Sequence, residues 1–202
     1  PDHGSPYWLD QVKSWSLNPL KDLFLMSDME HIPFFDPKEM ASRPVEDFIP
    51  RSLRHQSDRW VMGETGGLTG NPAFTVYRND EFHDAFIRPF LIAAHMSNFP
   101  SKGHWIWIGP SGPHLIGKAA RSCAAAQGQP DPFSVDFDPR WARKLPKHSV
   151  AFSRYMDHIL EQSLRIFHTQ KIEIIFTTPV IIQKLSDVLS PSQRSTIRGI
   201  HY

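Results

Sequence analysis

The sequence predicts an α/β fold with a mostly parallel sheet flanked by helices. From about residue 100, short β-rich segments at 104–108, 132–136 and 172–177 alternate with longer segments that have the period of amphipathic helices. Alternation of strand, loop and helix is typical of βαβ units, in which neighbouring strands run parallel. The composition, with 40% hydrophobic and 21% charged residues, fits a globular protein that buries a core.

The elements before residue 100 each have a local signal. Residues 1–57 hold many of the 18 prolines and predict short helices and extended arms. Two apolar runs, 59–62 and 74–77, predict strands on either side of a glycine-rich segment. Asn79 or Asp80 then caps a helix that continues to about residue 97, because either side chain can accept a hydrogen bond from the first helical turn.

The elements after residue 100 are delimited by turn and capping residues. Gly128 marks the end of a small-residue helix, because glycine readily takes the left-handed conformation at that position. Proline follows a hydroxyl residue at Thr178-Pro179 and again at Ser190-Pro191, a pattern that begins helices. The expected order is strand 104–108, turn 109–113, helix 114–127, strand 132–136, helix 150–169, strand 172–177, helices from Pro179 and Pro191, and strand 197–202.

Composition and charge exclude several classes of function. A formal net charge of +1 without clusters of Lys and Arg argues against nucleic-acid binding. No apolar run reaches the roughly 20 residues of a membrane span, and no signal peptide is visible at the start, so we expect a cytoplasmic protein. Cys123, the single cysteine, lies in an alanine-rich helical stretch and is expected to be a buried structural thiol.

The glycine-rich segment from Glu64 to Tyr77 is the strongest chemical signal in the chain. Glycines allow close backbone approach, so that successive N–H groups can converge on phosphate oxygens, and threonine hydroxyls add donors. Gly-Gly and Gly-Asn-Pro are also ordinary turn sequences, and a structural hairpin turn remains the alternative. The residues assigned to phosphate binding are Thr65, Gly66, Gly67, Leu68, Thr69 and Gly70.

Further candidates lie after the strand at 104–108. His114 follows Gly-Pro at a helix start, where the helix N-terminus favours anions, and a surface or capping histidine is the alternative. Trp107, near the end of its strand, is placed to stack on a flat ligand, whereas Trp105 is expected in the core. Asp136 and Asp138 are better explained by a turn and an ion pair with a following arginine than by catalysis. No metal site is predicted, because the 11 histidines lack the spacing of zinc ligands.

The segment Thr65-Gly-Gly-Leu-Thr-Gly-Asn-Pro72 resembles the phosphate-binding loop of the adenylate-forming superfamily, which includes the acyl-coenzyme A synthetases and phenylacetate-coenzyme A ligases. Leu68 stands where that loop usually has Thr, and Ala73 where it has Lys. The segments 108–114, 133–141 and 174–179 follow in the order expected for the family, and are most similar to the adenylate-forming proteins of phenazine antibiotic biosynthesis.

The resemblance implies ATP-dependent activation of an aromatic carboxylic acid as an acyl-adenylate, with Mg²⁺ bridging the phosphates and the acyl group passed to coenzyme A, a carrier protein or an amine. It implies an acid pocket formed by Trp107, Ser111, Gly112 and His114, and names no catalytic residue here. It divides the chain into an N-terminal segment, 1–57, and a nucleotide- and acid-binding portion, 58–202, without the family's C-terminal domain. We expect such a piece to be inactive alone. The alternative is a non-catalytic α/β binding module.

Overall fold

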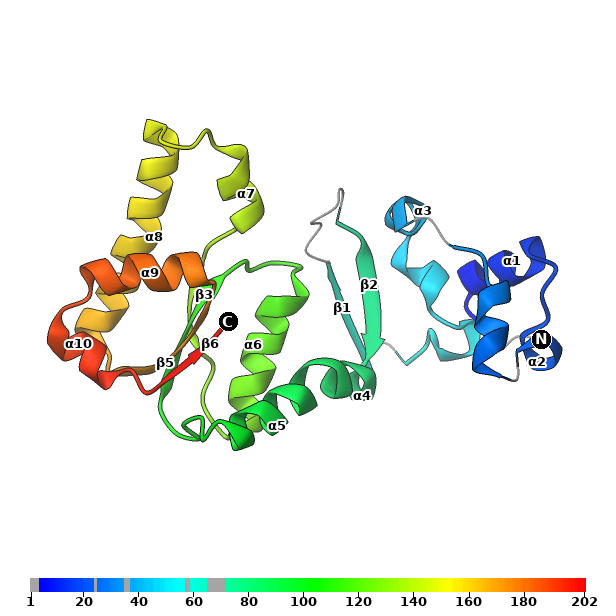
Figure 1. The fold of residues 1–202 in the computed structure, drawn as a ribbon, viewed down its shortest axis with the longest axis horizontal. Coiled ribbons are helices and arrows are strands. Elements are labelled where there is room, and N and C mark those ends of the chain that lie inside the picture. The colour runs from blue at the N-terminus through cyan, green and yellow to red at the C-terminus, as the bar shows by residue number, and fades with distance from the viewer. Residues whose placement is uncertain (1–3, 24, 35–36, 57–58, 65–71) are drawn as a thin grey trace. The chain divides into compact units, whose positions relative to one another are not determined.

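The structure is a computed structural model that describes all residues except 1–3, 24, 35–36, 57–58 and 65–71 (Figure 1). The contacts divide the chain into two compact units, Pro1–Phe82 and His83–Tyr202. The boundary predicted between residues 57 and 58 falls inside the first unit, so the strands that flank the glycine-rich segment belong to the same unit as the N-terminal helices.

The first unit consists mainly of short helices, many of which begin at a proline. Proline suits the first helical turn, where its missing N–H would have no intrahelical partner. Tyr7 is fully buried, packs against Phe48 with ring centroids 4.9 Å apart, and has the Arg43 guanidinium over its ring. The elements are α1 (Pro6–Ser14), α2 (Pro19–Asp22), η1 (Met26–His31), α3 (Pro37–Ala41), η2 (Val45–Phe48), η3 (Arg51–Leu53), β1 (Trp60–Glu64), β2 (Phe74–Arg78) and α4 (Asn79–Phe82).

Strands β1 and β2 form an antiparallel two-stranded sheet of their own, in the first unit. The register runs from Trp60 opposite Arg78 to Glu64 opposite Phe74. Both strands were predicted from their apolar runs. Their antiparallel pairing sets them apart from the parallel sheet that the alternating pattern of the later sequence indicates.

The second unit contains the parallel sheet, so the predicted α/β class with a mostly parallel, helix-flanked sheet is confirmed (Figure 1). Its four strands lie in the order β4-β3-β5-β6, and every neighbouring pair is parallel. The elements are η5 (His83–Ile87), α5 (Arg88–Met96), β3 (His104–Gly109), α6 (Leu115–Ala126), β4 (Phe133–Asp136), α7 (Pro139–Lys144), α8 (Val150–Thr169), β5 (Ile172–Thr177), α9 (Pro179–Val188), α10 (Pro191–Thr196) and β6 (Gly199–His201).

The predicted helix starts at Pro179 and Pro191 are present, although the Thr178 side chain makes no capping hydrogen bond. Ser149 accepts a hydrogen bond from the Phe152 amide and begins α8, and Ser190 forms a reciprocal capping box with Gln193 at the start of α10. Gly128 follows α6 with a φ of +68°, the left-handed conformation in which glycine has no steric penalty. The helix predicted from residue 79 to 97 is present as α4, η5 and α5, where η5 is a single π-helical segment.

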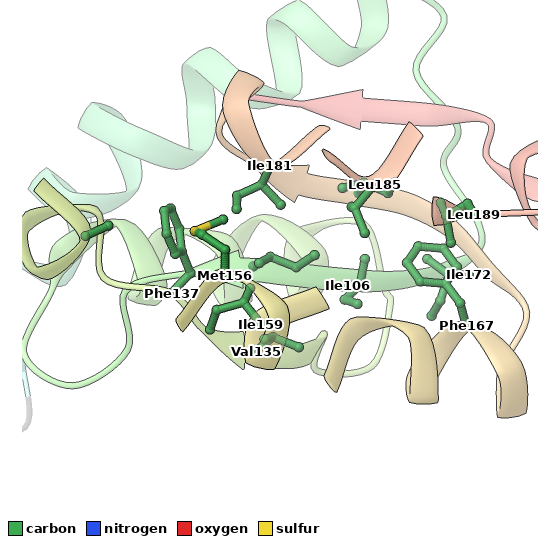
Figure 2. Close-up of a cluster of buried hydrophobic side chains, with 13 residues drawn as sticks. Ile106, Val135, Phe137, Met156, Ile159, Phe167, Ile172, Ile181, Leu185 and Leu189 are labelled. Atoms are coloured by element: carbon green, nitrogen blue, oxygen red, sulfur yellow. The ribbon is translucent and has the colours of Figure 1, made fainter. Parts of the chain in front are cut away.

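One face of the parallel sheet is covered by α8 and α9. Figure 2 shows the buried cluster on this face, to which Ile106 contributes from β3, Ile159 from α8, and Ile181 and Leu185 from α9. Each of these four side chains is at most 1% exposed. Burial of these aliphatic groups supplies the main driving force for closing this side of the sheet, since each fully buried side chain contributes about 1.5–3 kcal/mol.

The other face is packed against α5 and α6 and is aromatic. Trp105 is 2% exposed and makes edge contacts with Phe90 of α5, so its predicted place in the core is confirmed. Alanines of α6 let that helix approach the tryptophan-bearing face closely. Cys123 on α6 is buried, and burial raises the pKa of its thiol to about 12, which confirms the predicted structural thiol.

Candidate functional site

The strand order creates a topological switch point between β3 and β5. The chain leaves β3 into α6 on the tryptophan-bearing face, and leaves the neighbouring strand β5 into α9 on the opposite face. In doubly wound sheets the loops separate at such a point, and ligands bind beyond the carboxyl ends of the two strands. In this chain those ends are Gly109 and Thr177. The loop after β3, residues 110–114, carries three of the four residues predicted for the acid pocket.

Trp107, the fourth predicted residue, forms a buried wall beneath this edge. It is 5% exposed and meets Phe176 of β5 edge-on, with ring centroids 4.8 Å apart. Its indole ring lies over Gly109, where any Cβ would overlap it. The Trp107 Nε1 atom is buried and has no hydrogen-bond acceptor among the described residues. Trp107 therefore has a buried N–H donor without an acceptor among the described residues, on the face of the sheet that it shares with Phe176. Its stacking on a flat ligand stays a prediction.

The loop after β3 is fixed at one end and open at the other. The Ser111 amide donates a hydrogen bond of 2.9 Å to Oδ1 of Asp136, which ends β4. Gly112 has a φ of +71° and open space around its Cα, so the loop turns outward there. His114, the N-cap residue of α6, is only 8% exposed. The structure thus brings Ser111, Gly112 and His114 to the carboxyl edge of the sheet, and buries the histidine in it.

His114 contacts a network that begins at the end of β4. Arg140 Nη2 lies 2.6 Å from His114 Nε2, and Arg140 Nε lies 3.5 Å from Asp138 Oδ1. Asp138 also accepts a 2.8 Å hydrogen bond from the Arg140 amide and thereby caps α7. Burial works to raise the pKa of the Asp138 carboxyl, but the amide hydrogen bonds and the Arg140 charge outweigh it, so that the pKa is lowered. The predicted turn and ion pair of Asp138 are present.

Two further residues with polar side chains at this edge of the sheet were not assigned to the site from the sequence. Tyr155 of α8 accepts a 2.9 Å hydrogen bond from the Asp138 amide, and burial raises the pKa of its phenol, which keeps it protonated. Thr178, after β5, has a buried Oγ1 without a hydrogen-bond partner among the described residues. Thr178 follows a β-branched strand and precedes Pro179, and this position at a strand end could have indicated a site residue. Tyr155 lies in the middle of a helix, where the sequence pattern gives no indication of a role in a site.

An aromatic cluster extends from Trp107 along the same face of the sheet. His201 of β6 lies between Phe176 and Phe90, with ring centroid distances of 4.2 and 5.1 Å. Burial lowers the pKa of the His201 imidazole, because the charged form loses its hydration there. His201 is therefore neutral near pH 7 and acts as a further aromatic group in the wall.

The residues predicted to bind phosphate, Thr65, Gly66, Gly67, Leu68, Thr69 and Gly70, lie outside the described residues. The nearest strand residues on either side of them are Glu64, which ends β1, and Phe74, which begins β2, and these two residues pair with each other. The first unit also contains a cavity of about 420 Å³ by the far ends of these strands, lined by Leu53, Gln56, Arg59, Trp60, Arg78, Asn79 and Asp80. None of the predicted site residues that the structure describes lines this cavity.

The described residues include no group that could bind a metal ion. In the described ranges, no three His, Cys, Asp or Glu side chains are grouped closely enough to hold a metal ion. Within the same ranges, no helix combines the length and the apolar character needed to cross a membrane.

Comparison with protein-family models and with curated proteins gave no match to this chain.

Proposed function

We propose that this chain contributes to ATP-dependent activation of an aromatic carboxylic acid, with the acid bound at the switch point between β3 and β5. In this reaction a carboxylate oxygen attacks the α-phosphorus of ATP, the bond to the β-phosphate bridging oxygen breaks, and pyrophosphate leaves with that electron pair. The observation that carries the proposal is the parallel pairing of β3 and β5 up to Ile108 and Thr177, which puts the start of the His114 loop and the end of β5 at one edge of the sheet, next to buried Trp107 and Phe176.

The groups at this edge suit a planar acid. Trp107, Phe176 and His201 supply an apolar wall whose ring edges favour contact with another aromatic system. His114 supplies a buried polar group, and the N-termini of α6 and α9 at the same edge favour a carboxylate through their helix dipoles. Ser111 and Gly112 are exposed on the loop, with Ser111 fixed by Asp136 and Gly112 in open space. The edge therefore pairs a buried aromatic cluster, whose rings meet edge-on, with groups that stabilise negative charge.

The nucleotide half of the proposal rests on the sequence alone. Thr65 to Gly70 would hold the β- and γ-phosphates through backbone amides and hydroxyls, and Mg²⁺ bound with ATP would offset the phosphate charge. Catalysis of this type depends on positioning and charge stabilisation more than on a nucleophilic side chain. The acyl acceptor, which we take to be coenzyme A or another nucleophile, would enter in a later step.

A second candidate function is a non-catalytic binding module in which the glycine-rich segment is only a turn. The antiparallel pairing of β1 with β2 up to Glu64 and Phe74 favours it, because a hairpin turn is the simplest connection between such strands. The switch point would then bind an aromatic acid without activating it.

Acid-dependent release of pyrophosphate distinguishes the two functions. The complete gene product, supplied with ATP, magnesium and planar aromatic carboxylic acids of one to three rings, is expected to release pyrophosphate with at least one of them. Acetate serves as the control acid, because it has the carboxylate but cannot use the aromatic wall. Absence of release across the panel, with an acid nevertheless bound in calorimetry, would contradict acid activation and support the binding module.

A further inference from the structure

The contact between Arg140 and His114 determines which imidazole nitrogen carries a proton. Arg140 Nη2 lies 2.6 Å from His114 Nε2, and the histidine is 8% exposed. A guanidinium has N–H donors and no acceptor, and it stays charged at any ordinary pH. His114 Nε2 must therefore present its lone pair to Arg140. In a neutral imidazole whose Nε2 accepts, the proton is on Nδ1.

Arg140 is itself held in place from the other side. The Asp138 carboxylate accepts from the Arg140 amide at 2.8 Å and lies 3.5 Å from Arg140 Nε. The Asp138 amide in turn donates to Tyr155 Oη at 2.9 Å, so hydrogen bonds hold both the backbone and the side chain of Asp138. Pro139 fixes φ at the first position of α7. The guanidinium therefore reaches His114 from a backbone that is fixed by hydrogen bonds.

We propose that Arg140 is a positioning residue that keeps His114 in the Nδ1–H tautomer, so that Nδ1 is the nitrogen with which His114 donates. A group that contacts His114 Nδ1 must then be a hydrogen-bond acceptor, such as a carboxylate oxygen. The identity of that acceptor as the carboxylate of an aromatic acid rests on the proposed function. The tautomer does not, because it follows from the Arg140 contact alone.

Long-range ¹H–¹⁵N correlation spectra of the ¹⁵N-labelled chain test this assignment without ATP or acid. The His114 resonances are identified by their loss in His114→Asn. In the wild-type chain, Nε2 is expected to show the shift of an unprotonated, accepting nitrogen and Nδ1 that of a protonated one. Arg140→Ala is expected to lose this pattern and to move toward the Nε2–H tautomer that free histidine favours, while Arg140→Lys, which keeps a charged donor, retains it at least in part.

Arg143→Ala is the matched control. Arg143 lies on the same helix, is exposed, and donates to the Pro139 carbonyl rather than to His114, so this variant is expected to leave the His114 pattern unchanged. A wild-type spectrum with the proton on Nε2 would overturn the proposal, even if Arg140→Ala failed to fold. So would an unchanged pattern in a folded Arg140→Ala. If no pyrophosphate is released but the Nδ1–H pattern is found, the proposed function is contradicted and the tautomer assignment stands.

Discussion

Replacing Ile159 with alanine is expected to lower the free energy of unfolding by about 2–5 kcal/mol, the range for removing a large aliphatic side chain from a packed core. Ile159 is 1% exposed and belongs to the cluster between the sheet and helices α8 and α9 (Figure 2). Its neighbours come from several elements, so the cavity left behind cannot close by moving one side chain. Urea unfolding followed by circular dichroism measures the change.

Val150→Ala is the control for this prediction. Val150 is also β-branched and lies on α8, but it is 70% exposed, so its replacement should change stability by no more than about 0.5 kcal/mol. Equal losses in the two variants would contradict a core on this face of α8, because alanine favours a helix more than either replaced residue does and only lost packing could then explain a loss.

Replacing Gly109 with alanine is expected to cost about 1–3 kcal/mol, the usual range for overpacking. A Cβ on Gly109 would overlap the six-membered ring of Trp107 and lie 2.8 Å from its Cε2 atom. The ring cannot easily move away, because it is buried and packs against Phe176. Since Gly109 ends β3, the same change would also shift the loop that carries His114.

A double-mutant cycle with Trp107→Leu isolates the clash. The smaller, flexible leucine should leave room for the new methyl group, so Gly109→Ala is expected to cost less in the Trp107→Leu background than in the wild-type chain. Purely additive costs would mean that glycine is required at 109 for a backbone reason and that the ring contact is not the cause.

The local elements were predictable because their signals are local. The bounds of α8 and β5 agree with the predicted 150–169 and 172–177, since the helix has an amphipathic period and a β-branched run follows it. The π-helical segment η5 was not predictable, because it differs from an α-helix by a small shift in hydrogen bonding that leaves the same apolar pattern. The antiparallel pairing of β1 with β2 in a separate sheet was not predictable either, because the apolar pattern of one strand does not show which strand it pairs with.

The candidate site was only partly predictable, for a related reason. Glycine, proline and histidine at 109–114 mark the loop after β3, and this loop does lie at the carboxyl edge of the sheet. The partner of His114 is Arg140, 26 positions away, and the contact depends on β4 lying next to β3. Strand order is set by how the crossovers pack, which no single segment encodes. The buried Nε1 of Trp107 likewise depends on the approach of α6.

Backbone amide chemical-shift mapping with an aromatic carboxylate gives the most direct test of the central claim that the acid binds at the switch point between β3 and β5. Benzoate and a three-ring aromatic acid are titrated into the ¹⁵N-labelled chain. The amides of Ser111, Gly112, His114 and Thr178 are expected to shift, while those of His104 and Lys171, at the opposite edge of the same sheet, stay in place. Shifts confined to the opposite edge, or to the cavity at Trp60 in the first unit, would contradict the claim.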